Sequence, residues 1–160
     1  MKKISIILFI LAAIGACKQP IKTEPETPKQ EVSEFDAELA KEYGADDYGM
    51  KKFVIAFLKR GPNRSQDSIT AASLQRAHMD NIKKMAEAGK LVLAGPFFGD
   101  DDLRGIYVFD VADLAEAKAL TQSDPAIQAG SLIMELREWY GSAALMGIPE
   151  WHKKIAKSEI

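Results

Sequence analysis

The segment KKFVIAFL, residues 51–58, places large apolar side chains on both sides of an extended strand. The segment GIYVFDV, residues 105–111, has the same property. A strand of this kind is stable in water only when both faces of its sheet are covered. This requirement restricts the chain to folds in which something packs on each side of a β-sheet.

Apolar periodicity and helix-breaking residues predict four strands and two helices. In chain order these are a strand at 51–58, a helix at 68–88, strands at 90–98 and 105–111, a helix at 113–122 and a strand at 131–141. Gly89 is suited to end the first helix, and Asp113 and Glu116 form a capping box at the start of the second. Residues 123–130 predict one additional helical turn. The order is β-α-β-β-α-β, which predicts an α+β, ferredoxin-like sandwich.

Two helices cover only one face of a four-stranded sheet, so the second face needs another partner. We expect a second copy of the chain, packed sheet to sheet in a closed twofold homodimer, which would form a dimeric α+β barrel. The alternative is cover from within the chain by residues 35–43, where apolar residues recur every four positions. A short helix there would have Ser33 as its N-cap and would end at Gly44.

The N-terminus has the pattern of a secretory signal. Lys2 and Lys3 precede an apolar run, Ile4 to Ile14, that is shorter than the about 20 residues needed to span a bilayer. The run leads into Ile-Gly-Ala-Cys, which resembles a bacterial lipobox with Cys17 as the lipid attachment residue. Cys17 is the only cysteine in the chain. The alternative is an ordinary signal peptide that happens to be followed by a cysteine.

These features predict four segments. They are a lipoprotein signal peptide at 1–16, a flexible tether with a short helix at 17–48, an α+β domain at 49–147 and a charged, peripheral tail at 148–160. Because Lys18 rather than an aspartate follows the cysteine, we expect a lipid anchor in the outer membrane of a bacterial cell envelope, facing the periplasm. The net charge of -2 and the absence of a basic run give no indication of a nucleic-acid partner.

The helix predicted at 68–88 carries a histidine on its apolar side. At 100° per residue His78 shares a face with Leu74, Ile82 and Met85. A histidine buried in such a stripe carries a desolvation cost unless it is hydrogen-bonded. Taken alone, the pattern favours a hydrogen-bonded core histidine over a functional acid or base, and both interpretations stay open.

Asp124, in SDPAIQAG, is the second candidate. An Asp-Pro pair is a strong helix start, with Asp124 as N-cap and Pro125 at the first helical position. The same carboxylate can keep one oxygen to orient a histidine, or can take a proton itself. The two roles are compatible, and the spacing does not show that Asp124 meets His78.

Other polar residues carry weaker indications. Residues 100–102, three aspartates, fit either a metal site or the turn of a β-hairpin, and we favour the turn. Glu135 and Arg137 project from one face of the last strand, where they either line a cavity or form a salt bridge at a dimer seam. We favour the seam, and we expect His152 in the charged tail to be exposed.

The sequence contains no nucleophile elbow, no glycine-rich phosphate loop and no Cys/His spacing typical of a metal site. With Cys17 assigned to lipidation, no thiol nucleophile remains. We therefore expect no cofactor and no bound metal.

Residues 50–141 as a whole resemble the YCII-related (YciI-like) domain family. The residues that carry the resemblance are His78, Gly89, Gly95 with Pro96, Asp124 with Pro125, Gly130 and Trp139. The resemblance implies a dimeric α+β barrel and an active site in a cleft where His78 and Asp124 come together. Some relatives are lyases or dehydrochlorinases on small ring compounds, and related barrels isomerise muconolactones, so it also implies proton abstraction and return. Asp124 would then fix the tautomer of His78 and leave its other nitrogen for the substrate proton.

Two function classes follow. One is a small acid/base enzyme, lyase- or isomerase-like, in which His78 and Asp124 are catalytic. The other is a non-catalytic, lipid-anchored module that holds a small-molecule ligand in the same cleft. A close approach of the two side chains beside a cavity favours the first class, whereas a filled core around His78 favours a structural role.

Overall fold

The computed structural model describes residues 34–158, and the chain from Phe35 onward forms one compact unit. The predicted signal peptide, Cys17, Ser33 and the tether up to residue 33 lie outside the described residues. Within residues 34–158, no helix is both long enough and apolar enough to cross a membrane.

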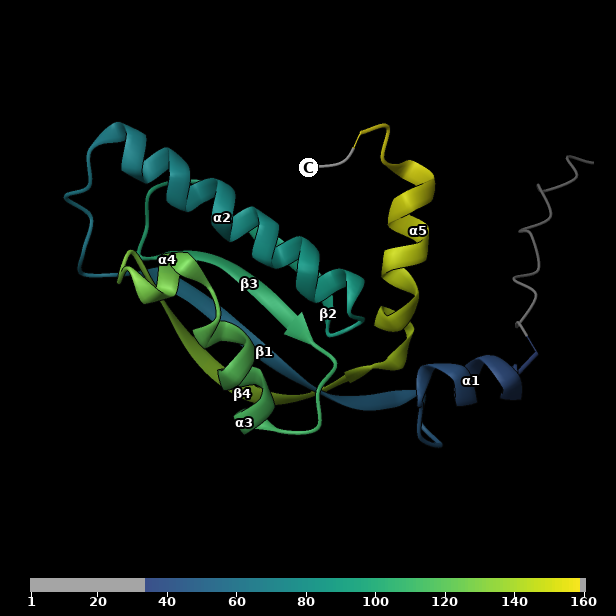
Figure 1. Ribbon diagram of the computed structural model, residues 1–160. Coiled ribbons are helices and arrows are strands. Elements are labelled where there is room, and N and C mark those ends of the chain that lie inside the picture. Colours follow the sequence, from purple (N-terminus) through teal and green to yellow (C-terminus); the bar gives the residue numbers. More distant parts are fainter. Residues whose placement is uncertain (1–33, 159–160) are drawn as a thin grey trace, which may run out of the picture. The chain divides into compact units, whose positions relative to one another are not determined.

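The elements follow the predicted order, with additions at both ends (Figure 1). They are α1 (Ala37–Tyr43), β1 (Met50–Arg60), α2 (Ser68–Glu87), β2 (Leu91–Pro96), β3 (Leu103–Phe109), α3 (Leu114–Gln122), α4 (Pro125–Gln128), β4 (Leu132–Ser142), the 3-10 helix η1 (Ala143–Gly147) and α5 (Ile148–Ile155). The four strands form one antiparallel sheet in the order β2-β3-β1-β4. This arrangement confirms the predicted ferredoxin-like α+β fold.

The ends of the two long helices agree with their sequence signals. The Asp67 carboxylate caps α2, and Gly89 follows its last turn with a left-handed φ of 68°. Asp113 accepts a hydrogen bond from the backbone N–H of Glu116, as the capping box predicts. The reciprocal bond is displaced by one residue, because the Glu116 carboxylate accepts from the N–H of Ala112.

The main core lies between the sheet and the helices on one of its faces (Figure 1). Its buried members are Val54, Ala56 and Leu58 of β1, Met85 of α2, Leu91 of β2, Tyr107 and Phe109 of β3, Val111 and Ala117. The alternation of β1 therefore places one of its two apolar faces under α2 and α3. His78, which is also buried, belongs to this layer.

The opposite face of the sheet is covered in part by η1. Leu145 and Met146 pack against a second apolar cluster made by Phe53, Val92 and Val108. No local signal in residues 143–147 predicted this cover.

The alternative that residues 35–43 cover the sheet is wrong. Phe35 and Leu39 remain 79% and 43% exposed, and α1 packs against η1. The predicted stop at Gly44 is confirmed by its left-handed φ of 67°. The N-cap of α1 is Asp36 rather than Ser33, because the Asp36 carboxylate accepts from the N–H of Leu39.

Glu135 and Arg137 lie on the η1 side of the sheet, away from His78. β4 alternates, so that Met134 and Leu136 pack on the main core while the residues between them face the other way. Glu135 accepts hydrogen bonds from Lys59 and from Arg137, and these two cations hold the pKa of its carboxyl below the ordinary value. The two residues therefore do not line the side of the sheet that holds the histidine.

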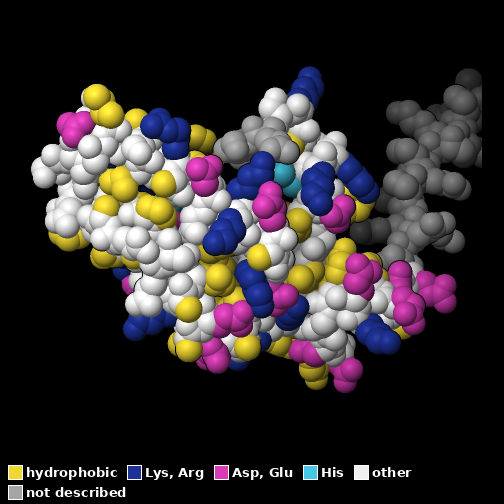
Figure 2. Space-filling view, in the orientation of Figure 1, with side chains coloured by type: hydrophobic (Ala, Val, Ile, Leu, Met, Phe, Trp, Pro, Cys, Tyr) yellow, Lys and Arg dark blue, Asp and Glu magenta, His cyan; other side chains and the backbone are white. Residues whose placement is uncertain are grey.

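The last segment is helical, which the prediction of a charged tail at 148–160 did not specify. None of the α5 side chains is buried, so its peripheral position is confirmed, and His152 is exposed as expected. On the face drawn in Figure 2, Lys and Arg side chains of the described residues are interspersed with Asp and Glu side chains.

Candidate active site

The structure brings His78 and Asp124 together. Nδ1 of His78 lies 2.7 Å from Oδ2 of Asp124, although the two residues are 46 positions apart in the chain. His78 is 7% exposed and Asp124 is fully buried. The approach that the family resemblance implied, and that spacing alone could not show, is present in the fold.

Asp124 is held by both of its carboxylate oxygens. Oδ1 accepts from the N–H of Ala126 at 2.8 Å, which is the predicted N-cap of α4. Oδ2 accepts from His78 and, at a longer 3.5 Å, from the amide of Asn81. The capping role and the pairing role therefore coexist in one side chain.

A third residue, Tyr107 of β3, completes the site. Its hydroxyl oxygen lies 3.2 Å from Nε2 of His78, and the residue is 2% exposed. A carboxylate can only accept hydrogen bonds, so the proton of the His78–Asp124 bond lies on Nδ1 when Asp124 is ionised. In the neutral tautomer that this bond selects, Nε2 accepts from the Tyr107 hydroxyl. Both ring nitrogens of His78 therefore have buried partners, which by itself favours a structural role for the ring. Nε2, expected to be free for a substrate proton, becomes accessible only when the Tyr107 hydroxyl is displaced.

Sequence reasoning missed Tyr107 because it lies among apolar residues in a core strand. Its hydroxyl group could have indicated a role in the site, because a buried tyrosine hydroxyl needs a hydrogen-bond partner. Its two-residue spacing from Phe109 also placed it on the main-core face of β3. Within residues 34–158, every buried polar side-chain atom has a hydrogen-bond partner. The carboxylate, imidazole and phenol thus form one continuous hydrogen-bonded chain.

A groove of about 300 Å³ lies beside this chain, between α2 and α3. Its lining residues are Asn81, Lys84, Met85, Ala88, Glu116, Ala119, Leu120 and Ser123. Neither His78 nor Asp124 is among them. The connection runs through Asn81, which hydrogen-bonds to Asp124 on one side and accepts from the Ser123 hydroxyl at 3.2 Å on the other.

Comparison with known proteins identifies the family. The family model of the YCII-related domain matches residues 53–140, more than half of the chain. The chain belongs to the YCII-related domain family. No curated protein matches the sequence of this YCII-related chain.

Among solved structures, this YCII-related protein is similar to 5-chloro-2-hydroxyhydroquinone dehydrochlorinase from Burkholderia phenoliruptrix AC1100, in complex with 2,5-dihydroxybenzoquinone. The two are 16% identical, with 56% of this chain and 93% of that chain covered, and the TM-score is 0.42.

The remaining candidate residues of the YCII-related chain lie away from the His78 site. Asp100 and its two aspartate neighbours occupy the turn between β2 and β3, as favoured from the sequence, and Asp100 pairs with Arg60 and Arg104. Arg60 holds the pKa of the Asp100 carboxyl below its ordinary value. Cys17 falls outside the described residues.

Tyr107 makes a testable contribution to stability at high pH. Burial raises its pKa far above the ordinary value of 10.0, and the charge of Asp124 adds to the effect. Above pH 10 the unfolded chain releases the tyrosine proton while the folded chain keeps it, so stability falls by up to about 1.4 kcal/mol per pH unit. In urea unfolding between pH 9 and pH 11, Tyr107→Phe should show a shallower decline than the wild type. Equal slopes would contradict the burial of an un-ionised phenol.

Proposed function

We propose that this YCII-related protein is a small acid/base enzyme, lyase- or isomerase-like, in which His78 removes and returns a proton on a small organic substrate. The observation that supports it is the 2.7 Å bond between His78 Nδ1 and the fully buried carboxylate of Asp124. Burying an ionisable pair is costly and is a weak route to stability. A carboxylate that accepts from one ring nitrogen of a histidine is also the arrangement that orients a general base.

The proton transfer follows from the tautomer. With Nδ1–H directed at Asp124, the lone pair of His78 is on Nε2, where Tyr107 now donates. A substrate that replaces the Tyr107 hydroxyl transfers a C–H proton to Nε2 and keeps the electron pair as an enolate. The imidazolium formed is stabilised by Asp124. Return of the proton to another carbon gives an isomer, and expulsion of a leaving group from the enolate gives an elimination product.

Exchange of carbon-bound hydrogen with deuterated solvent tests this proposal without knowledge of the product. In D₂O, with a panel of small cyclic ketones and lactones, the wild type should incorporate deuterium next to the carbonyl. His78→Gln and Asp124→Asn should each slow this exchange by about 10²- to 10⁴-fold. Asp113→Asn makes the same chemical change at the exposed cap of α3 and should leave the exchange unchanged. A folded His78→Gln protein that exchanges at the wild-type rate would refute the proposal.

The second candidate function is a non-catalytic module that binds a small ligand. The observation in its favour is that the groove between α2 and α3 is lined by neither member of the His78–Asp124 pair. In this case a ligand binds with saturation, its carbon-bound hydrogens do not exchange, and His78→Gln changes folding stability without changing affinity.

The protein also acts as a homodimer in this proposal. The part of the sheet beyond η1 presents Ile133 and Trp139, which are 48% and 39% exposed, beside the partly buried Phe57 and Ile106. A second copy packed on this face would bury these side chains and would place Glu135 at the seam. Light scattering should give twice the chain mass, and Ile133→Lys should shift it toward the monomer. A monomeric wild type would contradict this assembly.

A lipid anchor at Cys17 holds the domain at the outer membrane, facing the periplasm. The supporting features are the short apolar leader and the Ile-Gly-Ala-Cys sequence before the proline-rich segment. Cells fed labelled palmitate should label the wild type and not Cys17→Ser. An unlabelled wild type would contradict lipidation.

A further inference from the structure

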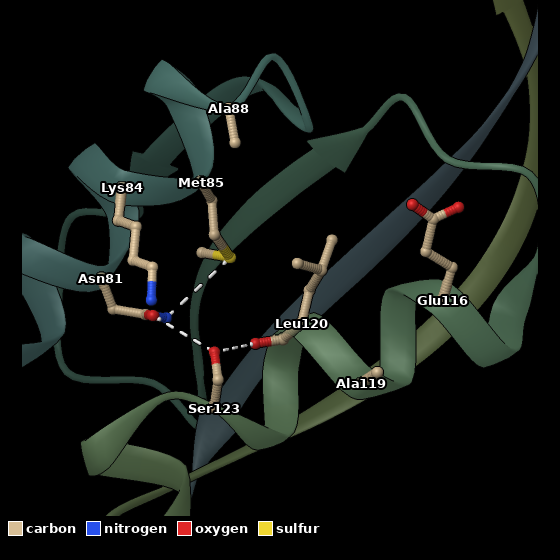
Figure 3. Close-up of a pocket in the computed structure, with 8 residues that line it drawn as sticks. All are labelled: Asn81, Lys84, Met85, Ala88, Glu116, Ala119, Leu120 and Ser123. Carbon is tan, nitrogen blue, oxygen red and sulfur yellow. Dashed lines mark hydrogen bonds between the residues drawn. The ribbon is translucent and has the colours of Figure 1, made fainter.

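The groove between α2 and α3 has an apolar part, a polar end at Asn81, Lys84 and Ser123, and one carboxylate, that of Glu116, away from that end (Figure 3). Met85, Ala88, Ala119 and Leu120 provide the apolar lining. The two alanines leave the space open, because larger side chains at these positions would project into it. A volume of about 300 Å³ is at the lower end for ligand sites, which suits a single ring with one or two substituents.

The polar end is formed by Asn81, Ser123 and Lys84. Asn81 accepts from the Ser123 hydroxyl, and its amide bond to Asp124 is long at 3.5 Å, so the amide is available to a better acceptor. Lys84 lies one helical turn after Asn81, and its ammonium group points toward the same end of the groove (Figure 3). Two kinds of hydrogen-bond donor therefore meet there.

The charges around the groove favour an anion. Glu116, the acidic residue of the lining, is paired with Lys90 at 2.7 Å and also accepts from the N–H of Ala112. This pairing with Lys90 holds the pKa of the Glu116 carboxyl below its ordinary value. Within residues 34–158, Lys84 makes no ion pair. One positive charge is thus left uncompensated at the polar end.

We propose that this groove binds a small planar monocarboxylate with a single aromatic ring. The ring lies against Met85, Ala119 and Leu120, and the carboxylate pairs with Lys84 and accepts from the Asn81 amide. This inference rests on the proposed function only in taking the protein to act on, or bind, a small organic molecule. It names the class of that molecule and requires no proton transfer.

Asn81 connects the groove to the catalytic candidates. When its amide turns to the ligand carboxylate, Asp124 loses its weakest donor and keeps His78 and the N–H of Ala126. Binding in the groove should therefore alter the imidazole resonances of His78, although the ligand does not contact the ring. This effect distinguishes the groove from an unrelated patch on the surface.

Benzoate and its uncharged analogue benzamide are the probes. We expect two-dimensional NMR of the full chain in detergent micelles to show saturable shifts at the lining residues with benzoate, with a Kd of millimolar or tighter. Benzamide should bind at least about five-fold more weakly, because it lacks the charge that pairs with Lys84. Equal affinity for the two probes, or no saturable shift with benzoate, would overturn the proposal.

Matched variants locate the site. Lys84→Gln should weaken benzoate binding by about five-fold, and Ala119→Leu should abolish saturable binding by filling the groove. Lys118→Gln and Ala86→Leu make the same changes at exposed helical positions outside the lining and should leave the Kd unchanged. All four keep good helix formers, so folding should be retained, which the same spectra report. Wild-type affinity in Lys84→Gln or Ala119→Leu would refute the assignment.

The benzoate titration and the deuterium-exchange experiment test the two proposals separately. A protein that binds benzoate in the groove and exchanges no carbon-bound hydrogen would refute the acid/base enzyme alone. A protein that exchanges hydrogen through His78 and does not bind benzoate would refute the groove assignment alone.

Discussion

Replacing Asp124 with alanine should lower the free energy of unfolding by about 3–5 kcal/mol. The substitution leaves a ring N–H of His78 and the N–H of Ala126 without their acceptor inside the core. It also removes the side-chain cap of α4, a helix of four residues. Because Asp124 is fully buried, water cannot replace the lost bonds without opening the structure.

Urea unfolding measures this loss, and two other variants separate its causes. Asp124→Asn keeps an oxygen for the N-cap and nearly the same volume, so it should recover part of the stability. Asp113→Ala removes an exposed cap from α3 and should cost only about 1 kcal/mol. If Asp124→Ala cost no more than Asp113→Ala, the N–H groups of His78 and Ala126 would not depend on Asp124 as their buried acceptor.

Replacing Gly61 with alanine should cost about 3 kcal/mol, because a side chain there has no room. A Cβ on Gly61 would lie 2.2 Å from the carbonyl oxygen of Gly130 and 2.7 Å from the carbonyl carbon of Ser131. These are backbone atoms, and two backbone hydrogen bonds hold the segments together, Gly61 N–H to Ser131 at 3.0 Å and Asn63 N–H to Gly130 at 3.0 Å. The clash can be relieved only by moving the segment that follows α4.

Gly95→Ala is the matched control, because no atom lies within 4 Å of the Cβ it would add to β2. It should change the free energy of unfolding by less than about 1 kcal/mol, measured in the same urea titrations. The distance between α4 and β1 also sets the position of Asp124, so Gly61→Ala should alter the imidazole resonances of His78. A Gly61→Ala protein as stable as Gly95→Ala would show that the two loops separate easily.

The order of the elements was predictable because each local signal acts within a few residues. The caps Asp113 and Asp124 and the stop at Gly89 are satisfied by their own helices, so they operate before any tertiary contact forms. The one N-cap predicted at the wrong residue was that of α1, where a second capping side chain lies closer to the helix. Asp36 caps α1 in place of Ser33 because its carboxylate is at the correct distance from the N–H of Leu39.

Two members of the candidate site, His78 and Asp124, were predictable from the sequence, and the geometry of the site was not. The apolar stripe required His78 to find a partner, and Asp124 stood out as a cap with a spare oxygen. Their contact depends on how α2 and α4 pack over the sheet, which no spacing in the chain specifies. Tyr107 was missed because its hydroxyl gains a role only when β3 carries it beneath α2.

The sequence by itself determined the α+β order, the helix caps and the membership of the YCII-related family. It also identified the strands that have apolar residues on both faces. These features depend on local backbone preferences and on residue pattern. Only the tertiary structure decided that Asp124, His78 and Tyr107 form one buried chain. It also decided that η1 covers part of the second face and that a groove opens between α2 and α3. These features arise from side chains far apart in the chain, and their contacts are determined by packing rather than by neighbouring residues.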